Sequence, residues 1–242
     1  MAREYADGYL KEIHRHARAQ FLYAVTGVLE VKTEEGLWVV PPQRAVWLPP
    51  RCDHSLRARG SVSLRTLYVR PDACPAGFPM SPRLVNVSPL LRELVVRAVE
   101  MPIDYDEGGR EGRVMTMIFD EVRWLSDGPL HLPEPRDSRL RAINMALLAN
   151  PADARTLEHW AKQVGMSTRT LARLSRSECG VSFHQWRQQH RILAALPRLA
   201  GGQPVTTVAL DLGYETPGAF GAMFRKLMGV TPGRYFRSAP IK

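Results

Sequence analysis

One short pattern occurs twice in the C-terminal part of the chain, and it restricts the fold more than any other feature of the sequence. Ala161 precedes Gly165 by four residues, and Ala209 precedes Gly213 by the same number. An alanine in mid-helix lets a second helix cross closely, and a glycine after it can take the left-handed conformation that ends a helix. The repeat therefore predicts two similar helix-turn-helix units within residues 156–235.

The residues after each glycine fit a second helix. Ser167 and Thr216 stand at N-cap positions, and Pro217 suits the first helical position after Thr216. Apolar residues recur at helical spacing in both copies. They are Leu157, Trp160, Ala161, Val164, Leu171 and Leu174, then Val205, Val208, Ala209, Leu212, Phe220, Met223, Phe224 and Leu227. Each copy is expected to bury its own small core.

A helix is expected to join the two units. Ser182 and Gln185 have capping-box spacing, and the helix should run to about Leu196. At about 1.5 Å per residue this gives a connector of roughly 20 Å. Pro197 lacks an amide proton, so it is expected to kink or end this helix near Ala194.

The doubled units, the joining helix and the closing run from Gly229 to Tyr235 (GVTPGRY) resemble the DNA-binding domain of AraC/XylS-type transcription regulators. The resemblance implies that two recognition helices enter successive major grooves, about 34 Å apart, on one face of promoter DNA. It also implies RNA polymerase as a partner, with activation the commoner mode. The alternative is a helical bundle that binds no nucleic acid.

The distribution of charge supports binding to DNA. Residues 1–135 hold 17 Lys and Arg against 18 Asp and Glu, a net charge of −1, whereas residues 136–242 hold 16 against 6, a net charge of +10. A basic half beside a neutral half is the pattern expected when one domain binds nucleic acid.

The first recognition helix should present Arg169, Thr170 and Arg173 outward, because Leu171 and Leu174 face the core. By the family's pattern Arg169, Ala172 and Arg173 lie where bases are read, with phosphate contact as the alternative role. The matching outward positions of the second helix carry no hydrogen-bonding side chains, which predicts readout of thymine methyls and groove shape there. The residues expected to contact DNA are Arg169, Thr170, Ala172, Arg173, Arg176, Thr216, Pro217, Gly218, Gly221, Ala222, Arg225, Lys226 and Arg234.

The N-terminal part has a different pattern, with short runs rich in Val, Leu, Trp and Tyr. Predicted strands cover residues 21–25, 28–32, 37–40, 45–48, 56–59 and 64–69. Thr26–Gly27 and Glu34–Gly36 are predicted hairpin turns. Short strands at this spacing favour a small antiparallel sandwich or barrel.

Histidines gather in this part of the sequence. On one strand His14, His16 and Gln20 would point to the same face, and a later strand could bring His54 against them. Three imidazoles could hold one divalent ion such as Zn²⁺, Ni²⁺, Fe²⁺ or Mn²⁺. The spacing is similar to the metal-binding motifs of cupins, whose barrels also serve as sensor domains in AraC-type regulators.

The sequence departs from the cupin pattern at two positions. Gln20 stands where cupins have glutamate, and Arg51 stands where they usually have glycine. Both changes weaken the metal hypothesis, and two alternatives remain. The histidines could be surface polar residues, or they could bind an organic effector together with Gln20. Aromatic residues could line such a pocket or form plain core. They are Phe21, Tyr23, Trp38, Trp47 and Tyr68.

The segment between the two parts predicts helices over residues 90–101 and 113–125, each with one apolar face. Such faces pack either onto the sheet or onto a second subunit. The resemblance to AraC-type regulators, in which helices at this place often dimerise, implies a homodimer. Residues 128–136 are rich in proline and are predicted to be a linker. The next helix is expected over residues 139–149, after a cap at Asp137 or Ser138.

These observations predict an α+β chain in four segments. Residues 1–70 form a cupin-like sensor barrel, 71–127 hold the dimerisation helices, 128–136 are the linker, and 137–242 form the double helix-turn-helix domain. No apolar run approaches the length of a membrane span, and no signal peptide opens the chain, so a cytoplasmic location is expected. The predicted function is transcription regulation in response to an organic or metallic effector. The alternative is a metal-dependent cupin enzyme that carries a DNA-binding domain, for which Gln20 offers no anionic ligand.

Overall fold

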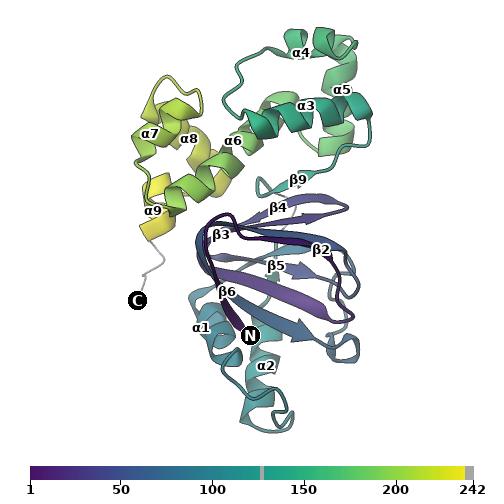
Figure 1. Cartoon of the computed structure of the whole chain (residues 1–242), viewed down its shortest axis with the longest axis vertical. Helices are drawn as coiled ribbons and strands as arrows, with labels where there is room; N and C mark the ends of the chain where they lie inside the picture. The colour runs from purple at the N-terminus through teal and green to yellow at the C-terminus, as the bar shows by residue number, and fades with distance from the viewer. Residues whose placement is uncertain (126–127, 238–242) are drawn as a thin grey trace. The chain divides into compact units, whose positions relative to one another are not determined.

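The computed structural model describes residues 1–125 and 128–237 (Figure 1). Residues 126–127, at the end of the predicted dimerisation segment, and residues 238–242, at the end of the predicted DNA-binding domain, lie outside the described residues. Contacts divide the chain into two units. The first comprises residues 1–34 and 38–128, and the second residues 35–37 and 129–238. No helix among the described residues is both long and apolar enough to cross a membrane.

The first unit is an antiparallel sheet with helices packed on it. Its strands are β1 (Ala2–Tyr5), β2 (Leu10–His14), β3 (Ala19–Thr33), β4 (Gly36–Val40), β5 (Arg44–Leu48), β6 (His54–Val69), β7 (Arg83–Asn86) and β8 (Arg123–Trp124). Its helices are the short η1 (Pro71–Ala73), α1 (Pro89–Ala98) and α2 (Arg110–Glu121). The strands lie in the order β1-β6-β3-β5-β7-β8, with β2 also paired to β6 and β4 to β3.

The two longest strands correct the predicted turns. The turn expected at Thr26–Gly27 is wrong, because β3 continues through it with an irregular register against β6. Gly27 has φ +71°, and a Cβ there would lie 2.6 Å from the Ser61 carbonyl oxygen. A glycine inside a strand marks a bulge as readily as a turn. Likewise β6 joins the two runs predicted over 56–59 and 64–69, whereas the turn at Glu34–Glu35 is confirmed.

One face of the sheet packs against α1 and α2. Phe21 is cross-strand from Trp47 and from Leu67, so these side chains share a face. They form one core with Leu91 of α1 and Ile118 of α2. The helix predicted over residues 113–125 ends earlier than expected, because Arg123–Trp124 leaves it to pair with β7 as β8.

The second unit is mainly helical. Its helices are α3 (Ser138–Ala149), α4 (Leu157–Gln163), α5 (Thr168–Cys179), α6 (Phe183–Ala200), α7 (Val205–Asp211), α8 (Pro217–Met228) and α9 (Pro232–Arg237). In Figure 1, α6 runs from the group α3–α5 to the group α7–α9. A short strand that the sequence did not predict, β9 (His131–Pro133), lies within the segment predicted to be a linker.

The doubled pattern forms two helix-turn-helix units as predicted. Gly165 and Gly213, with φ of +67° and +76°, each follow the C-cap residue of α4 and α7. The Ser167 side chain accepts a hydrogen bond from the amide of Thr170, and Thr216 caps α8 in the same way. Local chemistry therefore sets where each recognition helix begins.

The prediction for the joining helix was wrong at its C-terminal end. Helix α6 continues through Pro197 and spans 18 residues, which corresponds to about 27 Å. Leu193, Leu196 and Leu199 around the proline are buried at 5%, 0% and 7% exposure. Burial of these side chains offsets the hydrogen bond that proline cannot make.

Candidate DNA-binding surface and histidine cluster

Helix α5 has one buried face and one basic exposed face. Leu171, Ser175 and Cys179 are buried, and Leu174 is partly buried. On the other side Arg169, Arg173 and Arg176 are exposed, with Thr170 and Ala172 partly buried. In the described part of the chain, none of these three arginines forms an ion pair or a side-chain hydrogen bond. Their guanidinium groups therefore remain available for an external anion or base.

Other arginines of the same unit are paired within the protein. Arg139 forms an ion pair with Asp137 at 2.8 Å, and Arg155 forms one with Asp153 at 2.6 Å. Hydrogen bonding from Arg139 lowers the pKa of Asp137 to about 2. Arg139 and Arg155 therefore form ion pairs within the protein, whereas the exposed arginines of α5 form none among the described residues.

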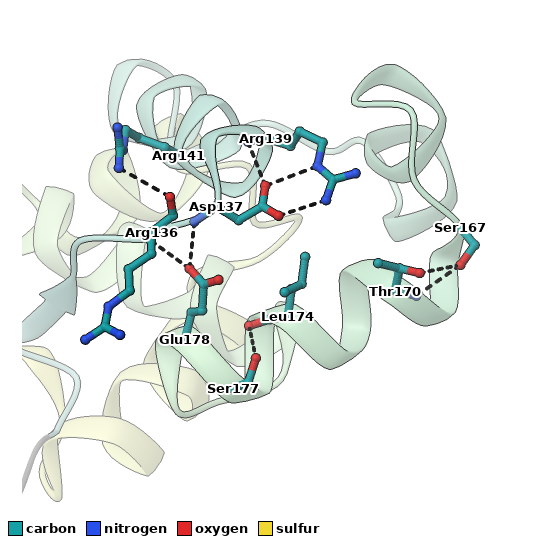
Figure 2. A network of polar contacts seen from close by, with 9 residues as sticks. All are labelled: Arg136, Asp137, Arg139, Arg141, Ser167, Thr170, Leu174, Ser177 and Glu178. Carbon is teal, nitrogen blue, oxygen red and sulfur yellow. Dashed lines mark hydrogen bonds and ion pairs between the residues drawn. The ribbon is translucent and has the colours of Figure 1, made fainter.

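Helix α5 is fixed at both ends by polar contacts (Figure 2). Ser167 caps its start. Near its end, the Glu178 carboxylate accepts hydrogen bonds from the backbone amides of Arg136 and Asp137, at 2.7 and 3.1 Å. These contacts tie the recognition helix to the start of α3. Sequence reasoning missed Glu178, because nothing in its spacing shows that it meets amides so far away in the chain.

Helix α8 presents a different surface. Pro217, Gly218 and Ala222 are exposed, and a Cβ placed on Gly221 would meet no atom within 4 Å. The Thr216 hydroxyl is already engaged as the cap, accepting from the amide of Ala219 at 3.2 Å. Pro217, Gly218, Gly221 and Ala222 have no side chain that can form a hydrogen bond, so this surface is apolar. Its basic residues, Arg225 and Lys226 on the last turn of α8 and Arg234 on α9, are exposed.

In the sheet unit, the structure brings together the three histidines singled out from the sequence. His14 ends β2 and is cross-strand from His54, the first residue of β6. The two ring centroids lie 4.3 Å apart, and His16 lies 4.9 Å from His14 and 5.6 Å from His54. The prediction of one strand carrying both His14 and His16 was wrong, because β2 ends at His14 and His16 lies in the following loop.

Backbone carbonyls fix the orientation of two of these rings. The Nδ1 atoms of His14 and His54 lie 2.8 and 2.9 Å from the carbonyl oxygens of Glu12 and Cys52. A carbonyl oxygen only accepts, so each Nδ1 carries the proton and donates it. Each Nε2 then keeps its lone pair. The sequence could not reveal this, because the two acceptors are backbone atoms.

The Nε2 atoms of the three histidines lack partners in the described chain. The Nε2 atoms of His14, His16 and His54 are buried and have no hydrogen-bond partner among the described residues. The potential ligand atoms of the three histidines all lie within 4.8 Å of one another. Burial lowers the pKa of His54 to about 4 and also lowers the pKa of His16. These two imidazoles are therefore neutral at pH 7.

Gln20 lies beside this cluster through Tyr68. Its Nε2 donates to the Tyr68 hydroxyl at 3.3 Å, and its Oε1 is buried without a partner in the described chain. The Tyr68 ring in turn meets the His16 ring edge to face, with centroids 5.2 Å apart. Gln20 therefore adds a fourth unsatisfied acceptor to this part of the sheet domain.

Trp47, predicted to line the effector site, is not brought to this cluster. It faces the helices, where its Nε1 donates to the Pro79 carbonyl at 3.0 Å. Phe21 and Tyr23 lie in the same core. Successive side chains of a strand point to opposite faces, so Gln20 and Phe21 cannot line one pocket. Of the predicted aromatic lining, Tyr68 contacts the cluster.

Arg51 stands where the cupin pattern has glycine, and its backbone shows why glycine would suit the position. Its φ is +63°, in the left-handed region that favours glycine. Its amide donates to the His16 carbonyl at 2.7 Å. The strained residue thus holds the loop that carries His16.

A duplicated helix-turn-helix domain with unpaired arginines, joined to a sheet domain with a buried polar cluster, defines a DNA-binding regulator with a ligand-binding domain. Comparison with known families agrees. The family model "Helix-turn-helix domain" matches residues 160–238, and "AraC-like ligand binding domain" matches residues 2–96. The chain belongs to the AraC family of helix-turn-helix transcriptional regulators.

The relative NimR supports this assignment. The chain is 35% identical to the HTH-type transcriptional regulator NimR of Escherichia coli over 229 residues, which is 95% of this chain and 83% of NimR. It is 28% identical to the arabinose operon regulatory protein of E. coli over 106 residues, or 43% of this chain and 36% of that protein. A solved structure of the AdpA DNA-binding domain in complex with target DNA is 29% identical over 41% of this chain and 91% of that one, with a TM-score of 0.39.

The predicted family, the α+β fold class and the DNA-binding function are thereby confirmed. The chain is a transcription regulator, and the alternative of a cupin enzyme is set aside by its family membership. The assignments of individual DNA-contacting residues, of the effector and of the metal remain predictions.

Proposed function

We propose that this protein is a cytoplasmic activator that binds promoter DNA as a homodimer. An effector bound in the sheet domain would change how the DNA-binding domains are presented to the promoter and to RNA polymerase. The observation that carries this proposal is the asymmetry of the two recognition helices. Helix α5 offers unpaired arginines, whereas α8 offers an apolar surface with cations at its end.

The two helices are then expected to contribute differently to binding. An arginine of α5 can form two hydrogen bonds to guanine, worth about 1–3 kcal/mol of discrimination against another base. The exposed surface of α8 supports van der Waals contact with thymine methyls and readout of groove shape. Arg225 and Lys226 suit contacts with phosphate, which supply affinity and no sequence information.

Paired substitutions test this division of labour. Arg173→Ala is expected to reduce binding to the cognate promoter by roughly 5- to 150-fold and to leave binding to random DNA nearly unchanged. Lys226→Ala is expected to weaken both equally and to reduce the salt slope by about one ion. Binding isotherms at several salt concentrations measure both effects. An equal loss on cognate and random DNA for Arg173→Ala would contradict its assignment to base readout.

A matched control comes from the sheet unit. Arg97 on α1 is also an exposed arginine, and it is paired with Glu100 at 3.6 Å. Arg97→Ala removes the same charge from a residue outside the DNA-binding domain. Its isotherms should match those of the parent protein within a factor of about two. Transcription in vitro from the bound promoter, with and without the protein, then separates activation from repression.

A further inference from the structure

The histidine cluster contains buried ring nitrogens to which the described residues offer no hydrogen bond. Three buried Nε2 atoms have no hydrogen-bond partner among the described residues, and the three histidines each offer a ring nitrogen within 4.8 Å of the other two. Leaving buried acceptors unsatisfied is unfavourable, and lone pairs directed at one another also repel. Such a cluster calls for a group that accepts several lone pairs at once.

A water molecule does not meet this need. One water can donate only two hydrogen bonds, whereas the Nε2 atoms of His14 and His54 and the Oε1 atom of Gln20 are three acceptors without partners in the described chain. A cation that binds all the lone pairs together resolves the mismatch.

The rings of His14 and His54 make the hydrogen bond that metal-bound imidazoles commonly make. A histidine that binds a metal through one nitrogen commonly donates its other N–H to a carbonyl or carboxylate, which fixes the tautomer. His14 and His54 make this donation to Glu12 and Cys52. Metal–nitrogen bonds are about 2.0–2.1 Å long, which places ligand nitrogens about 3.4 Å apart in a tetrahedral site. From an upper separation of 4.8 Å, each pair of ligand nitrogens needs to close by no more than about 1.4 Å.

We propose that His14, His16 and His54 bind one late first-row divalent transition ion through their Nε2 atoms, with Gln20 Oε1 as a fourth donor. Neutral imidazole favours Ni²⁺, Cu²⁺ and Zn²⁺, whereas Mg²⁺, Ca²⁺ and Mn²⁺ favour oxygen ligands that this cluster lacks. In the described residues, the group of potential ligands contains no carboxylate or thiolate.

The donor set has a consequence for charge. All four donors are neutral, and Lys11 adds a further positive charge near His16 and His54. The bound ion would therefore keep its full charge and attract an anionic ligand at its remaining position. Gln20→Glu supplies such an anion from the protein, so this substitution tests both the position of Gln20 and the charge argument.

The test measures metal binding directly, without DNA, so its outcome does not depend on the proposed regulatory function. Untagged full-length protein is freed of metal with chelator, dialysed, and titrated with Zn²⁺, Ni²⁺ or Co²⁺. Calorimetry gives the stoichiometry and the Kd, and the visible spectrum of bound Co²⁺ reports its ligands. The variants are His14→Ala, His54→Ala and Gln20→Glu. His184→Ala, which removes an exposed histidine of α6, is the matched control.

The parent protein and His184→Ala should each bind one equivalent. His14→Ala and His54→Ala should weaken binding by more than the 10- to 100-fold typical of losing an outer hydrogen-bond partner. Gln20→Glu should tighten it about tenfold or more. Circular dichroism of the alanine variants shows whether they fold, and Gln20→Glu provides a gain of affinity that misfolding cannot mimic. Less than one equivalent in the folded parent, or equal binding by His14→Ala and His184→Ala, would overturn the proposal.

Discussion

Gly221 offers a test that separates the stability of helix α8 from its contact with DNA. The residue lies inside a helix of 12 residues, and a Cβ placed on it meets no atom within 4 Å. Alanine in place of a glycine inside a helix stabilises it by about 0.8–1.0 kcal/mol, because the unfolded chain loses less entropy on folding. With no clash to offset this gain, Gly221→Ala should stabilise the DNA-binding domain by about 1 kcal/mol.

The same methyl group should be unfavourable on DNA. If the apolar surface of α8 lies against base edges, an added methyl group between them displaces the helix. Weaker cognate binding by about 1–2 kcal/mol, or roughly 5- to 30-fold, is then expected. Denaturant unfolding followed by tryptophan fluorescence measures the first effect, since Trp160 and Trp186 are buried in the same unit. Binding isotherms measure the second.

The two measurements can fail independently. A lower free energy of unfolding for Gly221→Ala would refute the open environment seen around Gly221. A more stable protein with unchanged DNA affinity would refute the placement of this surface against DNA. Ala222→Gly, at the neighbouring exposed position, is the reverse control and should lower stability by a similar amount.

Three further predictions follow from the two units. Arg51→Gly should raise the free energy of unfolding of the sheet domain by about 1 kcal/mol in denaturant titrations, because φ is +63° there; no change would show that the strain is absent. Burial lowers the pKa of His190 to about 4. Between about pH 6.5 and pH 4 the His190 imidazole is therefore protonated in the unfolded chain but neutral in the folded chain. Stability of the DNA-binding domain should thus fall by about 3 kcal/mol between pH 7 and pH 4, and His190→Gln should flatten that loss in unfolding curves measured across this range. Leu90 on α1 and Met117 on α2 are 48% and 46% exposed, so Leu90→Glu with Met117→Glu should convert the proposed dimer to a monomer in light scattering; an unchanged mass would place the interface elsewhere.

The sequence predicted best the features that depend on neighbouring residues. Gly165 and Gly213 end their helices because only nearby backbone geometry decides whether a left-handed residue is needed. Ser167 and Thr216 cap helices because each hydroxyl bonds an amide three residues further on. The doubled pattern therefore identified the domain without any knowledge of the tertiary fold.

Predictions failed where distant packing overrides a local preference. Pro197 was expected to kink or end the helix near Ala194, yet α6 does not end there, because Leu193, Leu196 and Leu199 are buried along the helix. Thr26–Gly27 has the composition of a turn, yet β3 passes through it because β6 supplies pairing on both sides. Neither outcome can be read from the residues on either side.

The histidine cluster likewise depends partly on local sequence and partly on tertiary structure. The sequence alone determined which residues were candidates, because His14, His16 and Gln20 are evenly spaced and, with His54, are similar to the cupin motifs. The tertiary structure alone decided that His16 reaches the cluster from a loop, that Trp47 faces away from Gln20's side of the sheet, and that carbonyls of Glu12 and Cys52 orient two rings. The physical reason is that residue type and spacing set local conformation and side-chain alternation, whereas convergence of side chains depends on strand register and on backbone acceptors that carry no sequence signature.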